Sequence, residues 1–96
     1  MATNDQPLVV RTGSQTLDRG IRMLELLGED GGLSIGELSE RLGLHRSITY
    51  RILRTLEAHG LAVRDDGGRV SLGVRMAALA RGVARDLQTA ALPELT

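Results

Sequence analysis

The feature that most constrains the fold of this chain is a very short connection between two predicted helices. Apolar residues recur at helical spacing over residues 35–42 and again over residues 46–59. Only residues 43–45 separate the two segments, and the first of them is a glycine. A connection this short makes the two helices cross steeply, which is the helix-turn-helix arrangement. The second helix of such a pair is the one that can be presented to a partner.

The segments on either side complete a winged helix-turn-helix. Ser14 can cap a helix over residues 15–27, and Ser34 can cap the helix that follows. Two short alternating strands flank a turn at residues 65–68 and predict a β-hairpin wing. Residues 74–90 have the composition of a further helix that could act as a linker. We therefore expect a mainly α fold with a three-helix core, a small two-stranded wing and a linker helix.

The predicted core is aliphatic. Tyr50 is the only aromatic residue among 96, so leucine, isoleucine, valine, methionine and alanine must supply the packing. The residues expected in the core are Leu17, Ile21, Leu24, Leu38, Leu42, Ile52, Leu53, Leu56, Leu61 and Val63.

Composition excludes several classes of function. The absence of cysteine excludes disulfides, a thiol nucleophile and a cysteine-ligated zinc site, and fits a cytoplasmic location. His45 and His59 lie at opposite ends of one predicted helix, about 20 Å apart, with no third metal ligand in view. No Gly-rich phosphate loop follows a strand. The apolar stretch near the N-terminus is too short for a membrane span. We expect no enzyme activity, no cofactor, no metal and no membrane association.

The distribution of charge is more informative than its sum. Net charge is zero, and all basic residues are arginines. Residues 14–32 carry two excess acids, whereas residues 44–59 carry two excess bases. Positive charge is thus concentrated on the second helix of the predicted helix-turn-helix.

One side of that helix has the residue types that bind DNA. A helical wheel places Ile48, Ile52 and Leu56 on the packed side, and polar side chains on the opposite side. Arginine can read guanine bidentately in the major groove, while hydroxyl groups and the helix N-terminus can hold phosphates. A surface helix with ordinary solvated arginines is the alternative. The order of helix, helix, short turn, basic helix and hairpin favours DNA binding, because few surface helices occur in that topology.

The charges of the predicted wing include some that favour and some that oppose contact with DNA. Arg64 and Arg69 flank its turn and can reach phosphate, but Asp65 and Asp66 at the tip would be repelled by the same phosphates. We expect contact through Arg69, with a solvated hairpin as the alternative. The full set of predicted DNA contacts is Ser34, His45, Arg46, Ser47, Tyr50, Arg51, Arg54 and Arg69.

Several motifs occur together in an order and spacing typical of one family. The stretches at residues 14–21, 33–38, 43–53 and 55–61 resemble the N-terminal domain of IclR-type transcriptional regulators, and the similarity extends over about residues 14–90. The resemblance implies a dimer on double-stranded operator DNA of partly palindromic sequence, with repression the more usual outcome. It also implies a larger C-terminal domain that senses a small-molecule effector.

The resemblance also assigns individual residues. Ser47 and Arg51 match the serine and arginine of the family's recognition helix and are carried over as DNA contacts. His45 and Ile48 depart from the family's usual residues, which leaves the operator sequence open. The homodimer is expected to form through the helix at 15–27 and the linker helix.

The predicted domain organisation follows from these assignments. Residues 1–13 form a flexible arm, residues 14–73 the DNA-binding domain and residues 74–90 the linker helix. Residues 91–96 resemble the start of an effector-binding domain that the chain does not continue. A winged-helix module for protein association is the alternative function. It requires an exposed apolar patch on the basic helix, and the residues there do not make one.

Overall fold

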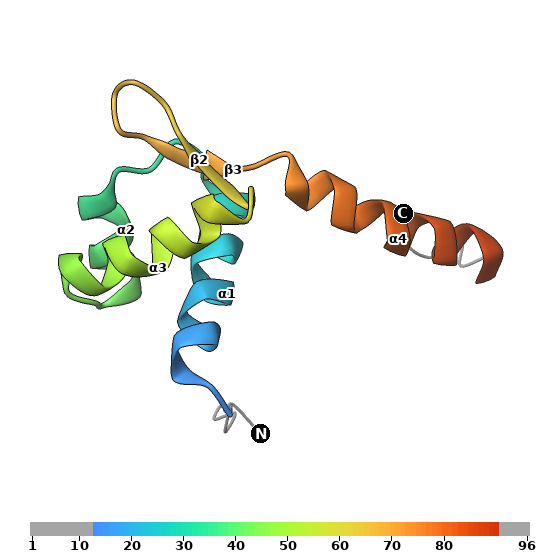
Figure 1. Cartoon of the computed structure of the whole chain (residues 1–96), viewed down its shortest axis with the longest axis horizontal. Coiled ribbons are helices and arrows are strands. Elements are labelled where there is room, and N and C mark those ends of the chain that lie inside the picture. The colour runs from blue at the N-terminus through green and yellow to red at the C-terminus, as the bar shows by residue number, and fades with distance from the viewer. Residues whose placement is uncertain (1–12, 91–96) are drawn as a thin grey trace.

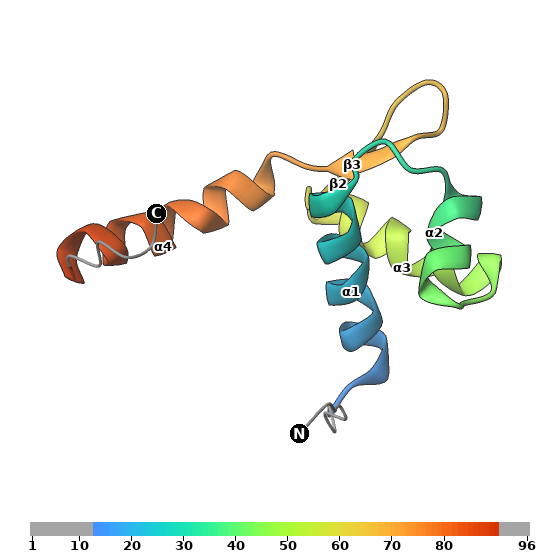
Figure 2. The same cartoon turned by 180° about the vertical axis from the view of Figure 1, so that it is seen from behind.

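A computed structural model describes residues 13–90 of the chain. Within this range the elements occur in the order α1 (Gln15–Glu29), α2 (Ile35–Leu42), α3 (Arg46–Ala58), β2 (Ala62–Arg64), β3 (Val70–Leu72) and α4 (Arg75–Ala90). The first three helices and the hairpin pack into one body, and α4 projects from it as an arm (Figure 1). The same arrangement is seen from behind in Figure 2. The predicted fold class is confirmed. Most of the predicted N-terminal arm, and residues 91–96, lie outside the described residues.

Local sequence signals determine where α1 and α2 begin and where α2 ends. The Ser14 hydroxyl accepts a hydrogen bond from the N–H of Leu17 at 3.1 Å. At the start of α2 the capping box is complete: Ser34 Oγ accepts from the backbone N–H of Glu37 at 3.1 Å, and the Glu37 carboxylate accepts from the Ser34 N–H at 2.8 Å. Gly43 ends α2 with a φ of 67°, a left-handed conformation that glycine adopts at no steric cost. The bounds of α2 agree with the sequence prediction.

The wing is anchored to the loop that follows α1. Strands β2 and β3 pair antiparallel, and Val70 of β3 also forms a bridge with Leu33 through hydrogen bonds of 2.7 and 3.1 Å. Asp65 orders the turn between the strands, because its carboxylate accepts a hydrogen bond from the backbone N–H of Arg69 at 2.9 Å. The hairpin therefore has a fixed position relative to the start of α2.

Apolar residues from α1, α2, α3 and the hairpin form one core. The side chains of Met23, Leu38, Leu53 and Val70 are completely or almost completely buried. The buried apolar set comprises Met23, Leu27, Leu33, Leu38, Leu42, Ile52, Leu53, Leu56, Ala62 and Val70.

Three residues predicted for the core are exposed. Leu17 is 62% exposed, Ile21 47% and Val63 50%. The two on α1 lie on its N-terminal half, and helical spacing identifies a face but not how far a packing partner extends along it. In β2 the small residue Ala62 faces inward. Successive residues of a strand face opposite sides, so Val63 faces outward. Leu24 and Leu61, also predicted, are half-buried against the core.

The buried face of α3 also differs from the prediction by one position. Thr49 is completely buried, while Ile48 is half-buried. A threonine can be buried here because its hydroxyl donates a hydrogen bond to the carbonyl of His45 at 3.1 Å, so no polar group is left without a partner. The outer face of α3 is unaffected by this change.

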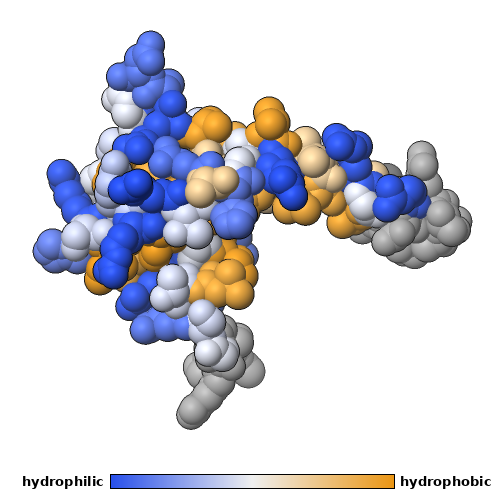
Figure 3. All heavy atoms as spheres, viewed as in Figure 1, coloured by the Kyte–Doolittle hydropathy of each residue, from blue (hydrophilic) through white to orange (hydrophobic). Residues whose placement is uncertain are grey.

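Helix α4 has an apolar stripe that faces solvent. Met76 is half-buried, whereas Leu79 and Val83 are more than half exposed, and helical spacing places all three on one side. Figure 3 shows this apolar surface along the arm. Among the described helices, none is both long and apolar enough to cross a bilayer.

The capping-box carboxylate makes stability depend on pH. The hydrogen bond from the backbone N–H of Ser34 lowers the pKa of Glu37 below its usual value, and the positive charges of Arg69 and Arg41 act in the same direction. Because the folded-state pKa lies below the unfolded-state value, the stabilisation is complete above about pH 4.5 and is lost as the pH falls through the folded-state pKa.

We therefore expect Glu37→Gln to lower the melting temperature at neutral pH and to have little effect in acid. Melting curves recorded over a pH series, with Glu40→Gln on the same helix as control, test this. A deficit for Glu37→Gln that stays constant into acid would show that the charge of Glu37 is not what stabilises the helix start.

Candidate nucleic-acid interface

The turn between α2 and α3 leaves one complete side of α3 uncovered. After the left-handed Gly43, the N–H of Leu44 donates a hydrogen bond to the carbonyl of Ser39 at 3.0 Å. His45 is then the N-cap residue of α3. The helix packs through its inner face against α1 and α2, so that its N-terminal turn and outer face meet solvent (Figure 1).

The N-terminal turn of α3 is polar and exposed. His45 Nδ1 accepts a hydrogen bond from the backbone N–H of Ser47 at 3.4 Å and lies 3.1 Å from Ser47 Oγ. The side chains of His45, Arg46 and Ser47 are all exposed. A helix N-terminus carries partial positive charge and unpaired N–H groups, so this end of α3 is suited to an anionic oxygen.

Two arginines and a serine follow the middle of the outer face. Successive residues are about 100° apart around a helix, which places Ser47, Arg51 and Arg54 opposite the buried side. Tyr50 lies at the edge of this face, and all four side chains are exposed. The predicted contact residues of α3 thus form one continuous surface, which we call the α3 face.

Arg46 lies where α3 meets α2. Its guanidinium packs over Gly36: a Cβ built on that glycine would lie 2.7 Å from Arg46 Nη2 and 3.3 Å from Cζ. A glycine in α2 therefore gives the arginine room beside the helix. The guanidinium is exposed there, at the border of the α3 face.

A cluster that the sequence did not predict joins the wing to the α3 face. Arg64 of β2 donates from Nε to Glu57 Oε2 at 2.7 Å and from Nη2 to Glu57 Oε1 at 3.2 Å. Its guanidinium carbon also lies 5.0 Å from the centre of the Tyr50 ring. The hydrogen bonds that Arg64 donates to the Glu57 carboxylate and, with a smaller effect, to the Tyr50 hydroxyl raise the pKa of Arg64 above its usual value. The spacing of Tyr50 and Glu57 puts them on one side of α3, but neither residue indicates that β2 returns to that side.

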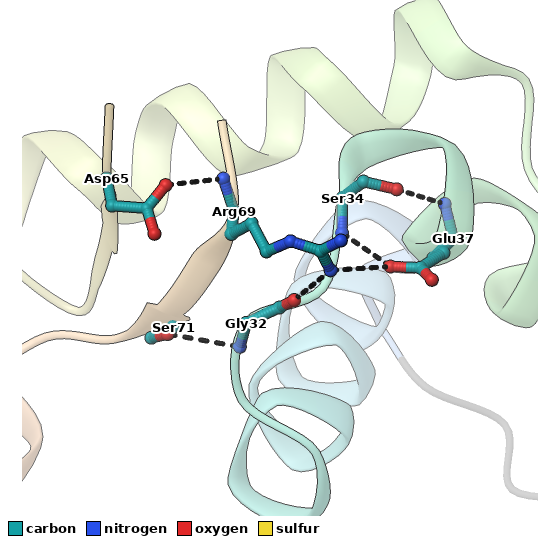
Figure 4. Close-up of polar contacts among 6 residues, drawn as sticks. All are labelled: Gly32, Ser34, Glu37, Asp65, Arg69 and Ser71. Carbon is teal, nitrogen blue, oxygen red and sulfur yellow. Dashed lines mark hydrogen bonds and ion pairs between the residues drawn. The ribbon is translucent and has the colours of Figure 1, made fainter. Parts of the chain in front are cut away.

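The remaining two predicted contacts, Ser34 and Arg69, meet at the N-terminus of α2 (Figure 4). Ser34 is engaged in the capping box. Arg69 Nη1 donates a hydrogen bond to the carbonyl of Gly32 at 2.8 Å and lies 3.6 Å from Glu37 Oε1. Arg69 thus joins the wing to the N-terminus of α2 in the free protein, while Ser34 caps that helix. Arg41, near the C-terminus of α2, forms an ion pair of 3.0 Å with Asp30.

Helix α3 carries more basic than acidic side chains. Glu57 is the only acid of α3, and Arg64 neutralises it. Arg46, Arg51 and Arg54 remain on the exposed side. A helix whose open surface carries arginines and hydroxyl groups, and whose acid is already paired, can bind a polyanion without a like-charge penalty.

Fold and surface together define a class of protein: a winged helix-turn-helix domain in which the second helix of the motif, α3, has an exposed basic face. Residues 16–66 match the family model described as the IclR helix-turn-helix domain. The chain belongs to the IclR family of helix-turn-helix transcriptional regulators.

Similar proteins include regulators from several bacteria. The chain is 38% identical to the HTH-type transcriptional regulator Rv1719 of Mycobacterium tuberculosis over 86 residues, which are 88% of this chain and 33% of the relative. It is 38% identical over 58 residues to the HTH-type transcriptional repressor AllR of Escherichia coli, covering 59% of this chain and 21% of AllR. The chain thus spans a third or less of the length of these relatives.

Solved structures give the same result for the fold. An IclR transcriptional regulator from Alicyclobacillus acidocaldarius superposes with a TM-score of 0.73 at 29% identity, over 76% of this chain and 30% of that one. An S-adenosylmethionine-dependent methyltransferase, SibL, superposes with a TM-score of 0.60 at 30% identity, over 77% of this chain but only 22% of the methyltransferase. The second similarity concerns a domain of that enzyme and not its whole chain.

Proposed function

We propose that this chain binds operator DNA sequence-specifically in transcriptional control, with α3 in the major groove. The observation that carries this proposal is the α3 face, an uncovered side of a helix with arginines and hydroxyl groups and no unpaired acid. A major groove accepts an α-helix, and these groups complement base edges and phosphates. We propose repression as the outcome, supported by the similarity to the repressor AllR.

The proposed contacts divide between bases and phosphates. Arg46 and Ser47, in the first turn of α3, enter the groove most deeply, and Arg46 pairs with a base edge. Arg51, Arg54 and Tyr50, further along the helix, bond phosphates. The other proposed phosphate contacts are Ser34, His45 and Arg69.

The test of this function is a selection from random DNA duplexes with the 96-residue chain. We expect one motif to be enriched, because base contacts favour it over other sequences by about 1 to 3 kcal/mol for each good bidentate pair. If the bound duplexes share no motif and the affinity depends only on salt, the chain binds DNA non-specifically. No retention of any duplex would overturn the proposal.

We further propose that two copies bind a partly palindromic operator as a dimer formed through α1 and α4. Leu17 and Ile21 of α1 are exposed, and Leu17 lines a groove of about 530 Å³ between α1 and α3. The apolar stripe of α4 is exposed as well, and the body of its own chain does not cover it. Exposed apolar patches of this kind favour association.

Charge supports the same pairing. Helix α1 carries the acids Asp18, Glu25 and Glu29 against two arginines, so it has an excess of negative charge. Helix α4 carries three arginines and one acid, so it has an excess of positive charge. An α4 helix seated on the partner's α1 helix therefore brings opposite charges together as it covers both apolar surfaces.

Disruption of the α4 stripe should weaken the dimer. We expect Leu79→Glu to lower the association constant by at least about tenfold, because burying a leucine is worth about 1.5 to 3 kcal/mol. Ala77→Glu adds the same charge outside the stripe and is the matched control. Sedimentation over a concentration series measures both. A parent chain that stays monomeric at high concentration, free and on its operator, would rule out this dimer.

The last part of the proposed function concerns the larger protein. We propose that a small-molecule effector is sensed by a C-terminal domain that would begin at residues 91–96 and follow the linker helix. Two observations support this part of the proposal. The chain belongs to the IclR family, and it covers only 33% of the length of its relative Rv1719.

A further inference from the structure

Arg64 crosses from the wing onto the recognition helix and contacts two of its residues. Tyr50 and Glu57 are seven residues apart in α3, close to two helical turns, and so lie on one side of the helix. The Arg64 guanidinium reaches both: it pairs with the Glu57 carboxylate through two hydrogen bonds and lies over the Tyr50 ring. No other described wing residue makes a hydrogen bond to the side chains of α3.

The pairing with Glu57 fixes the orientation of the guanidinium. Two parallel N–H donors meet the two carboxylate oxygens, a bidentate geometry that holds the plane of the arginine more firmly than one bond does. The side chains are 31% and 23% exposed, so solvent screens this pair less than it screens a fully exposed one. The donors that face Glu57 are not available to a phosphate.

The fixed guanidinium limits the movement of the Tyr50 side chain, because it contacts both the face of the ring and the hydroxyl group. A cation over the ring is attracted by the π-electron density, and the distance of 5.0 Å is within the range of this interaction. Arg64 Nη2 also lies 3.5 Å from the Tyr50 hydroxyl oxygen, at the long limit for a hydrogen bond. Because an arginine can only donate, the hydroxyl accepts on that side and its own hydrogen is free to donate elsewhere.

We propose that Arg64, held by Glu57, is a positioning residue that orders Tyr50 as a hydrogen-bond donor to the DNA backbone. This inference rests on the proposed function, in which Tyr50 bonds a phosphate. Tyr50 is then ordered before DNA arrives, so that less side-chain entropy is lost on binding. Arg64 acts through Tyr50 and itself touches no DNA.

Affinity measurements in a double-mutant cycle test the coupling. Arg64→Ala is made together with Glu57→Gln, because the alanine alone would leave the Glu57 charge unpaired beside the DNA. We expect this pair variant and Tyr50→Phe each to weaken operator binding by about fivefold, the size of one net hydrogen bond. If Arg64 acts through the Tyr50 hydroxyl, the combination of the two is also about fivefold weaker, and not about twenty-five-fold as for independent changes. A purely structural role in holding the wing would give the independent result. Melting curves of all variants show whether they are folded.

Salt dependence separates positioning from direct contact. A lost phosphate contact flattens the plot of log affinity against log salt by about one unit. We expect Arg64→Ala/Glu57→Gln, which leaves the local charge unchanged, to leave this slope unchanged, whereas Arg54→Ala, which removes a proposed phosphate contact, flattens it. Arg64→Lys keeps the charge but not the bidentate geometry, so it should bind as weakly as Arg64→Ala/Glu57→Gln. Full rescue by lysine, or a flattened slope for Arg64→Ala/Glu57→Gln, would overturn the inference.

The free protein offers a test that needs no operator. Tyr50 is the only tyrosine in a chain without tryptophan or phenylalanine, so intrinsic fluorescence reports this side chain alone. We expect Arg64→Ala to make Tyr50 more accessible to acrylamide quenching, with Arg22→Ala on α1 as a control that leaves quenching unchanged. Equal quenching in the parent and Arg64→Ala would overturn the inference and leave the proposed function intact. A parent chain that selects no operator would overturn the proposed function itself.

Discussion

Replacing Leu53 by alanine is expected to destabilise the domain by about 2 to 5 kcal/mol. Leu53 is completely buried in the middle of α3, within the cluster formed by α1, α2, α3 and the hairpin. The truncation removes apolar contacts and leaves a cavity that its rigid surroundings fill only in part. Since a small domain has only about 5 to 15 kcal/mol of total stability, the loss is a large share of it.

Thermal melting followed by circular dichroism measures this loss. A domain of this size shifts by about 4 to 8 °C for each kcal/mol, so the variant should melt far below the parent. Val74→Ala is a matched control, because Val74 is almost fully exposed and surface truncations usually change stability by less than about 0.5 kcal/mol. Equal melting temperatures for the parent and Leu53→Ala would place the core elsewhere.

Alanine at Arg46 and at Arg51 should affect DNA binding in two different ways. Arg46 lies in the first turn of α3 and is proposed to pair with a base edge. We expect Arg46→Ala to cost about 1 to 3 kcal/mol on the operator and much less on random DNA, so that specificity falls together with affinity.

Arg51 lies more than one turn further along α3, in the middle of the α3 face, and is proposed to bond a phosphate. Arg51→Ala should therefore weaken operator and random DNA alike, and flatten the salt plot by about one unit. Titrations of both variants on both duplexes at several salt concentrations distinguish the two roles. If the roles of the two arginines are exchanged, the two results exchange as well. Salt slopes and specificity ratios equal to those of the parent would contradict a contact by either residue.

The helix-turn-helix itself could be predicted from local signals. The capping box of Ser34 and Glu37 determines where α2 begins, and the left-handed Gly43 determines where it ends. Each signal lies within one helical turn of the helix end that it determines. The bounds of α2 depend on little else, which is why the prediction and the structure agree there. The exposed face of α3 was also predictable, since an arginine is seldom buried without a partner.

Packing between distant elements could not be predicted in the same way. The spacing of Leu17 and Ile21 indicates a common face on α1, but whether α3 covers that face depends on where the helices cross. In β2, a strand of three residues, the alternation is too short to determine its register, and Ala62 takes the inward position expected for Val63. The contacts of Arg64 with Glu57 and of Arg69 with Gly32 join residues that only the complete fold brings together.

The most direct test of the central claim is the ratio of operator affinity to random-DNA affinity for the double variant Arg46→Ala/Arg51→Ala, measured at physiological salt on the selected operator. If α3 reads the DNA, this ratio falls well below that of the parent while the melting temperature and circular dichroism spectrum stay unchanged. A folded double variant that binds the operator as tightly and as selectively as the parent would show that α3 is not the recognition helix.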